Sequence, residues 1–167
     1  MTMKSIIKSA LGDIDNEAEE KKKDDTTKNA FIICPVRQAT EEVKTVLDQI
    51  VSLLEQNGIK VHYPSRDTNQ DDPIGINICK QNGEAIKNAD MVYVFWHPDS
   101  TGSLFDLGMV FMSNLILGKP QIHLLNKEDI KKIAKNGVKS FENVLLNSET
   151  DDGLRIEASG LIKLRTK

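Results

Sequence analysis

The stretch ADMVYVFWHPDSTGSLFDLGMVF, residues 89–111, decides the fold of this chain. Its apolar run Met91–Trp96 predicts a strand that is buried on both faces, as strands of parallel sheets are. A polar loop, residues 97–102, separates this run from an apolar segment with helical spacing. Ligands of open α/β sheets bind beyond the carboxyl ends of the strands, where helix N-termini offer free N–H groups, so the loop predicts a binding crevice. Asp106, about one turn into the helix, is expected to point its carboxylate into that crevice.

Length and composition predict one domain without structural metals or disulfides. The chain has 167 residues, 39% of them hydrophobic, which is enough for a core of ordinary size. A formal net charge of -3 gives no field that would hold nucleic acid, and no apolar run reaches the roughly 18 residues of a membrane span. The N-terminus lacks the apolar core of a signal peptide. Cys34 and Cys79 match no metal spacing and are interpreted as small core residues in a reduced, cytoplasmic protein. We therefore expect no metal and no cofactor.

Residues 1–29 differ from the rest of the chain. Residues 3–11 have the spacing of a short amphipathic helix, and residues 13–28 are almost wholly charged or polar. Such a tract cannot bury enough apolar surface to form its own core. Two interpretations stay open, a solvated leader and an arm whose helix docks on a neighbouring subunit.

Strand and helix patterns alternate through residues 30–167. A β-rich run at 31–34, a helical pattern at 40–56 and an alternating run at 59–63 make a βαβ unit, which implies a parallel sheet. The further expected elements are a helix from Asp72-Pro73 to about 88, a strand at 121–125, short helices at 129–134 and 139–146, and an edge strand within 154–163. The sequence therefore predicts a single α/β domain of flavodoxin-like or Rossmann-like type, with a parallel sheet of four or five strands flanked by helices.

Three local signals predict where helices begin and end. Thr40 is a suitable N-cap for the helix at 41–56, and Asn57-Gly58 is a suitable stop. Gly118-Lys119-Pro120 is expected to end the helix that carries Asp106.

No glycine pattern of a dinucleotide or P-loop site is present in the sequence.

Three segments together resemble the nucleoside 2-deoxyribosyltransferase superfamily, which includes the deoxynucleoside 5′-monophosphate N-glycosidases. They are Phe31–Arg37 (FIICPVR), Asn82–Val92 (NGEAIKNADMV) and Ser100–Gly108 (STGSLFDLG). Each motif alone is weak, but the spacing between them agrees with the family over roughly residues 30–125. The resemblance implies a nucleotide or nucleoside ligand and an oligomer in which a neighbour completes the pocket. We therefore expect a homo-oligomer with a small-molecule partner.

The resemblance also assigns roles to individual residues. In the family a carboxylate attacks the anomeric carbon of a deoxyribosyl group, and water or a second base resolves the glycosyl-enzyme intermediate. Asp106 matches the position of this nucleophile. The residues expected around a 5′-phosphate are Arg37, Ser100, Gly102 and Ser103.

Three departures from the family pattern keep a second interpretation open. The nucleophilic glutamate is the shorter Asp106, the second carboxylate is Asn82, and the first-strand tyrosine is Phe31. Phe31 and Asn82 are accordingly expected to contact the substrate rather than to move protons. A nucleotide sensor that does not catalyse is therefore the alternative to an N-glycosidase or deoxyribosyltransferase. A more distant alternative is an interaction module without a small ligand.

Several further residues have both a structural and a functional interpretation. Asp90 begins the buried strand and is interpreted as structural. His97 and Asp99 are interpreted as solvated loop residues, although either could act as an acid or base. Trp96 and Phe105 could stack on a base or pack in the core. His62 and His123 are interpreted as ordinary strand residues.

Overall fold

Four parallel strands form the centre of the domain in the computed structural model, which describes residues 27–150. Their order in the sheet is β2-β1-β3-β4. The strands are β1 (Asn29–Ile33), β2 (Lys60–His62), β3 (Met91–Val94) and β4 (Gln121–Leu124). This arrangement confirms the predicted parallel α/β fold of flavodoxin-like or Rossmann-like type. The expected helix at 3–11 and the expected edge strand at 154–163 lie outside the described residues.

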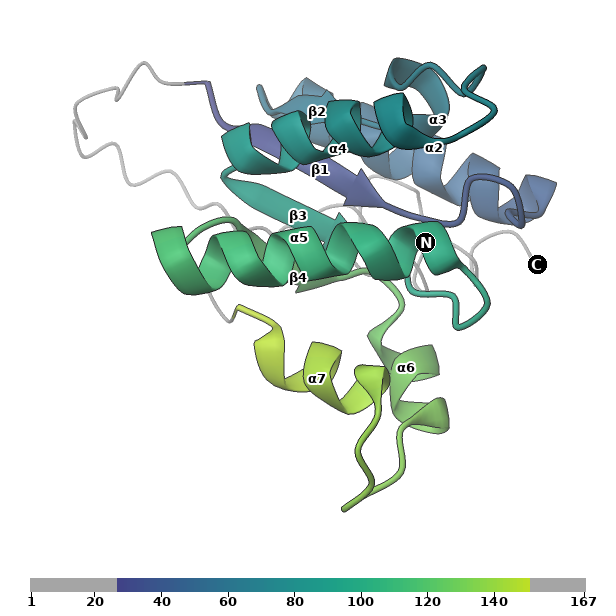
Figure 1. Cartoon of the computed structure of the whole chain (residues 1–167), viewed down its shortest axis with the longest axis vertical. Coiled ribbons are helices and arrows are strands. Elements are labelled where there is room, and N and C mark those ends of the chain that lie inside the picture. Colours follow the sequence, from purple (N-terminus) through teal and green to yellow (C-terminus); the bar gives the residue numbers. More distant parts are fainter. Residues whose placement is uncertain (1–26, 151–167) are drawn as a thin grey trace, which may run out of the picture.

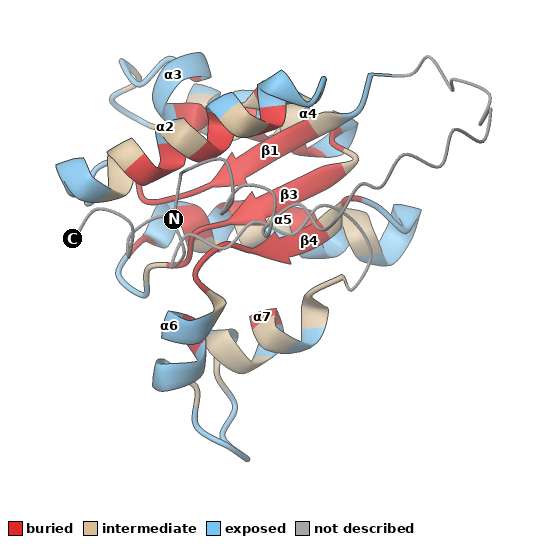
Figure 2. Ribbon diagram, turned by 180° about the vertical axis from the view of Figure 1, so that it is seen from behind, coloured by how far each residue is buried: buried red, intermediate tan, exposed pale blue. Residues whose placement is uncertain are grey.

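Helices cover both faces of this sheet (Figure 1). Helix α2 (Glu41–Gln56) lies on one face, and α4 (Ile76–Asn88) and α5 (Thr101–Leu117) lie on the other. Helix α3 (Pro64–Asp67) follows β2, while α6 (Lys127–Ile133) and α7 (Phe141–Ser148) follow β4. Because helices flank the sheet, the strands are buried along most of their length, and Figure 2 shows them as the buried layer between exposed helix surfaces.

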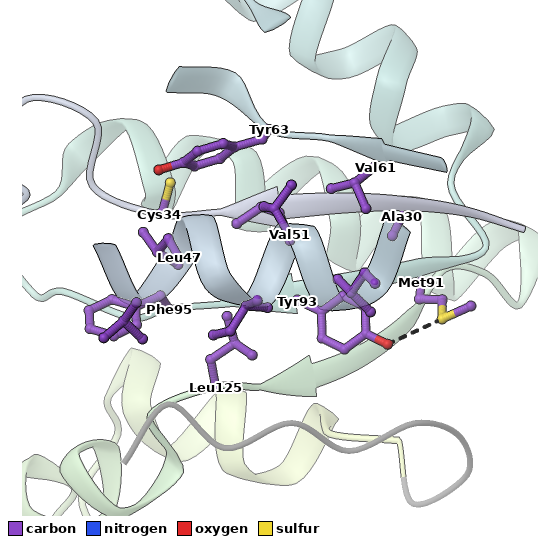
Figure 3. Close-up of a cluster of buried hydrophobic side chains, with 14 residues drawn as sticks. Ala30, Cys34, Leu47, Val51, Val61, Tyr63, Met91, Tyr93, Phe95 and Leu125 are labelled. Carbon is purple, nitrogen blue, oxygen red and sulfur yellow. Dashed lines mark hydrogen bonds between the residues drawn. The ribbon is translucent and has the colours of Figure 1, made fainter. Parts of the chain in front are cut away.

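Alternate residues of each strand face opposite sides of the sheet and enter two separate hydrophobic clusters. Ala30 and Ile32 of β1 belong to the cluster under α2, whereas Phe31 and Ile33 belong to the cluster under α4 and α5. Figure 3 shows the first cluster, in which Leu47 and Val51 of α2 pack over strand residues such as Tyr93. Burial of a side chain of this size stabilises the fold by roughly 1.5–3 kcal/mol relative to exposure. The two-sided burial explains why the run at 91–96 is continuously apolar.

The predicted helix ends at three places are confirmed. The Thr40 hydroxyl accepts a hydrogen bond from the Val43 N–H at 3.3 Å, and Thr40 is the N-cap of α2. Asn57 is its C-cap, and Gly58 follows at φ 77°. Gly118 ends α5 at φ 68°, a left-handed conformation that glycine adopts without steric cost.

The predicted start of α4 at Asp72-Pro73 is wrong, because the helix begins at Ile76. Gly75 is the N-cap at φ 84°, and this left-handed residue separates Pro73 from the helix. Asp72 still serves the helix from outside, since its carboxylate accepts from the N–H groups of Ile74 at 3.2 Å and Asn77 at 2.6 Å. The Asp-Pro signal thus marks a turn that caps the helix from a distance rather than the first helical turn.

The chain reverses its direction of travel across the sheet between β1 and β3. From β1 it moves outward to β2, and it then crosses back to place β3 on the other side of β1. Beyond the carboxyl ends of β1 and β3, the following segments diverge to opposite faces, which leaves a crevice. In open α/β sheets this switch point is where ligands bind.

Candidate functional site

A cavity of about 230 Å³ lies at this switch point. Its wall is built from the segment after β1, the segment after β2, helix α4 and the first turns of α5. The residues that line it include Cys34, Arg37, Cys79, Asn82, Ser100, Gly102, Ser103 and Asp106. The structure therefore brings together six of the seven residues that the sequence singled out as site residues, the exception being Phe31.

Asp106 and Asn82 form the buried centre of the site. The Asn82 side-chain amide donates from Nδ2 to both carboxylate oxygens of Asp106, at 3.3 Å and 3.1 Å. Asn82 lies on α4 and Asp106 on α5, so the contact depends on how closely these helices pack. Gly83 permits a close approach, because a Cβ at this position would lie 3.2 Å from the Met109 sulfur of α5.

Burial changes the acidity of Asp106. The side chain is only 8% exposed, and this desolvation raises the pKa of the carboxyl from 3.8 to about 6, although the hydrogen bond from Asn82 acts in the opposite direction. The group is therefore ionised at neutral pH, close to the pH at which it takes up a proton. A carboxyl of this kind in a cavity is a candidate nucleophile or general base.

The first turn of α5, just before Asp106 on the same helix, forms another part of the wall. Ser100 is the N-cap, and its hydroxyl accepts from the Ser103 N–H at 3.4 Å and lies 2.8 Å from the Ser103 hydroxyl. Both serines are buried. Gly102 lies between them in sequence and lines the cavity, and a Cβ there would meet no atom within 4 Å. The positive end of the helix dipole and its N–H groups thus border the cavity, which favours an anionic group.

Arg37 supplies a positive charge at the mouth of the cavity. It lies in the segment after β1, is exposed, and lines the cavity. It makes no hydrogen bond or ion pair with another residue of the range 27–150. An arginine without an ion-pair partner among these described residues is suited to the two oxygens of a phosphate or carboxylate.

Phe31 does not line the cavity. Its side chain is fully buried in the cluster under α4 and α5, and its ring stacks on His62 at a centroid distance of 5.4 Å. The family resemblance placed Phe31 at the substrate, whereas in the fold it is a core residue that does not reach the cavity.

Most of the residues that had both a structural and a functional interpretation have a structural role. The Asp90 carboxylate accepts from the Asn29 N–H at 2.8 Å and so joins two strands at the edge away from the cavity. Trp96 is buried and donates from its indole nitrogen to Glu142 at 3.1 Å. The Nδ1 atom of His97 accepts from the Asp99 N–H at 3.3 Å, and neither residue lines the cavity. Phe105 is exposed and lines it.

Two cysteines in the cavity wall were not recognised from the sequence as neighbours of Asp106. Cys34 is buried, and this burial, followed by the negative charge of Asp106, raises the pKa of its thiol to about 12. It therefore stays protonated and inert at neutral pH. Cys79 is half-buried and is also free. Only the placement of β1 and α4 brings these thiols together with Asp106, and no local sequence signal marks it.

The described residues hold no group of three or more histidine, cysteine, aspartate or glutamate side chains that could bind a metal. Within the same range, 27–150, every helix is too short or too polar to cross a membrane.

No protein-family model matches this chain, and no curated protein matches its sequence. The structure establishes the α/β fold with its four-stranded parallel sheet. The resemblance to the nucleoside 2-deoxyribosyltransferase superfamily stays a prediction.

Proposed function

We propose that this protein binds a nucleoside 5′-monophosphate, or a closely related nucleotide, in the Asp106 cavity. The observation that carries the proposal is the combination, around one cavity, of a buried carboxylate, a helix N-terminus and an arginine that has no ion-pair partner within residues 27–150. The Arg37 guanidinium and the first turn of α5 suit the phosphate. Asp106 suits the sugar, either as a hydrogen-bond acceptor for a hydroxyl or as a nucleophile at its anomeric carbon.

Glycosyl transfer or hydrolysis is the reaction that this arrangement supports. One oxygen of the ionised Asp106 would form a bond to the anomeric carbon while the bond from that carbon to the base nitrogen breaks. The base leaves with the electron pair and takes up a proton. Water or a second base then attacks the same carbon, releases the carboxylate, and gives the free sugar phosphate or a new nucleotide.

A nucleotide sensor without catalysis is the second candidate, and the composition of the cavity wall favours it. Asp106 is the sole carboxylate among the described residues that line the cavity, and none of these lining residues is a histidine. Asn82, which directly contacts Asp106, cannot give the departing base a proton as a carboxylic acid does. Incubation with a panel of ribo- and deoxyribonucleoside 5′-monophosphates, followed by chromatography for free base, separates the two candidates.

The phosphate contact is tested by calorimetry on monophosphates and the matching nucleosides. We expect monophosphates to bind more tightly, and Arg37→Ala to remove much of this preference, because a charge-assisted hydrogen bond contributes roughly 1.5–3 kcal/mol. Lys80→Ala is the matched control, since it removes a positive charge from the exposed surface of α4 without touching the cavity. Equal affinity for monophosphate and nucleoside, or an unchanged preference in Arg37→Ala, would contradict the proposal.

The exposed face of α5 is proposed as an interface between two copies of the chain. Large apolar side chains lie on it, including Phe111 at 47%, Leu115 at 70% and Ile116 at 69% exposure. A groove between α5 and α7 adjoins this face, and it shares Thr101 and Phe105 with the Asp106 cavity. A cavity of about 230 Å³ is below the usual range of roughly 300–1,000 Å³ for ligand sites. A second copy seated on α5 would extend the wall at Phe105 and cover the apolar face.

A further inference from the structure

A continuous chain of hydrogen bonds links His62 to Asp106. The Nε2 atom of His62 lies 2.9 Å from the Thr68 hydroxyl, and this hydroxyl donates to the Asn82 side-chain oxygen at 2.8 Å. Asn82 in turn donates to both oxygens of Asp106. The four residues come from β2, the end of α3, α4 and α5, so they meet only in the fold. Thr68, Asn82 and Asp106 are buried, which strengthens each contact relative to one in water.

The chain has one direction. A threonine hydroxyl carries a single proton, and in this chain it is directed to the Asn82 oxygen. The Thr68 oxygen can therefore only accept from His62, so the proton of that contact belongs to Nε2 of the imidazole. Each group donates to the next, and the chain ends at a carboxylate, which only accepts when ionised.

This direction is compatible with only one orientation of the Asn82 amide. A side-chain amide can rotate by 180°, which exchanges its NH₂ and its oxygen. The reversed amide would present its oxygen to the Asp106 carboxylate and its NH₂ to Thr68. The hydroxyl proton of Thr68, held toward Asn82 because His62 donates to its oxygen, opposes the reversed amide. The His62 ring is itself held by stacking on Phe31, with the two ring planes 13° apart.

We propose that His62 is a positioning residue for Asp106, which acts through Thr68 to keep the Asn82 amide donating to the carboxylate. Phe31 supports the ring in this position by stacking on it, although Phe31 does not line the cavity. The inference rests on the proposed function in one respect, that Asp106 is the group that meets the sugar. The inference itself concerns the orientation of the Asn82 amide, and it is tested on the protein without any nucleotide.

Charged side chains surround the His62 end of this chain of hydrogen bonds, and Glu55, Lys60 and Glu84 line one cavity together with His62. The His62 ring is faced by Asp67 and Arg66 of α3, and its own burial is the largest effect and lowers its pKa. The ring is therefore neutral at pH 7.5, and one nitrogen alone carries a proton. Asp106 is faced by the protonated Cys34 thiol in addition to Asn82.

The first test is nitrogen NMR of the histidine ring in the wild-type protein at pH 7.5. The ring nitrogen shifts of a neutral imidazole report which nitrogen is protonated. We expect the proton of His62 on Nε2. A proton on Nδ1 would reverse the direction of the chain and overturn the proposal, and this measurement needs no variant to fold.

The second test measures the pKa of Asp106 from the pH dependence of its carboxyl carbon shift in four variants. Thr68→Val and His62→Leu break the chain, and we expect each to raise the pKa of Asp106 by about half to one unit, because the donated bond from Asn82 is no longer held. Thr68→Ser keeps the hydroxyl and His62→Gln keeps an N–H at the place of Nε2, so both should stay near the wild-type value. An unchanged pKa in Thr68→Val and His62→Leu would overturn the proposal, as would equal shifts in the conservative variants. Neither outcome bears on whether a nucleotide binds.

Discussion

Replacing Asp106 by asparagine should stabilise the folded protein at neutral pH. The folded state holds the carboxyl at a pKa of about 6, above the ordinary 3.8, because burial disfavours the charged form. The folded state therefore binds the proton more tightly than the unfolded state. This contribution to stability is fully present below the unfolded pKa and is lost as the pH rises through the folded pKa. The window for this change is pH 3.8 to about 6.

The size of the effect follows from the shift. A difference of roughly 2 pKa units corresponds to about 3 kcal/mol, which is the upper bound for the stability gained when the charge is removed. The asparagine NH₂ that replaces one carboxylate oxygen then needs a partner in the buried site, and an unsatisfied group costs about 1–3 kcal/mol. We therefore expect a net gain of about 1 kcal/mol, and at most about 3 kcal/mol, for Asp106→Asn at pH 7.5.

Urea unfolding followed by the fluorescence of the single, buried Trp96 measures this difference. The gain of Asp106→Asn over the wild type should shrink as the pH is lowered from 7.5 to 4.5, because the wild-type carboxyl then becomes neutral. Asp48→Asn removes a carboxylate from the exposed surface of α2 and serves as the control for substitution alone. A difference between Asp106→Asn and the wild type that does not change with pH would refute the reasoning.

Two further predictions concern the cavity and the apolar face. Gly102→Ala adds a methyl group where no atom lies within 4 Å, so stability should stay equal or rise by up to about 1 kcal/mol while the calorimetric affinity for a monophosphate falls. Unchanged affinity would mean that the ligand does not approach the first turn of α5. Phe111→Glu should convert a dimer into a monomer in light scattering at tens of micromolar, whereas Ser52→Glu on the exposed surface of α2 should not. A monomeric wild type would contradict the proposed interface.

Local sequence signals predicted the parallel sheet and three of the helix ends. The apolar run at 91–96 predicted a strand buried on both faces. Successive residues of a strand face opposite sides of the sheet, so a continuously apolar strand needs helices over both sides. Thr40, Asn57-Gly58 and Gly118 marked helix ends, because the unpaired N–H and C=O groups there need particular side chains or a left-handed residue. The start of α4 was misplaced, since the capping by Asp72 acts across a left-handed Gly75 and involves residues up to five positions away.

The candidate cavity was also predictable in outline. Asp106 and the loop before it follow a buried strand, and the ends of parallel strands share one edge of the sheet. Arg37, after β1, was assigned to the same site by the family resemblance. These residues line one cavity in the structure.

The partners of Asp106 were decided by the tertiary structure alone. Asn82 lies 24 residues before Asp106, and the two meet where α4 and α5 pack closely beside Gly83. Thr68 and His62 had no local signal of any role, since a threonine in a polar loop and a histidine in a strand are ordinary residues. Hydrophobic periodicity records which side of an element faces the core, and caps record where the element ends. Neither records which polar side chains of different elements come within 3 Å, because that depends on the distances between packed helices and strands.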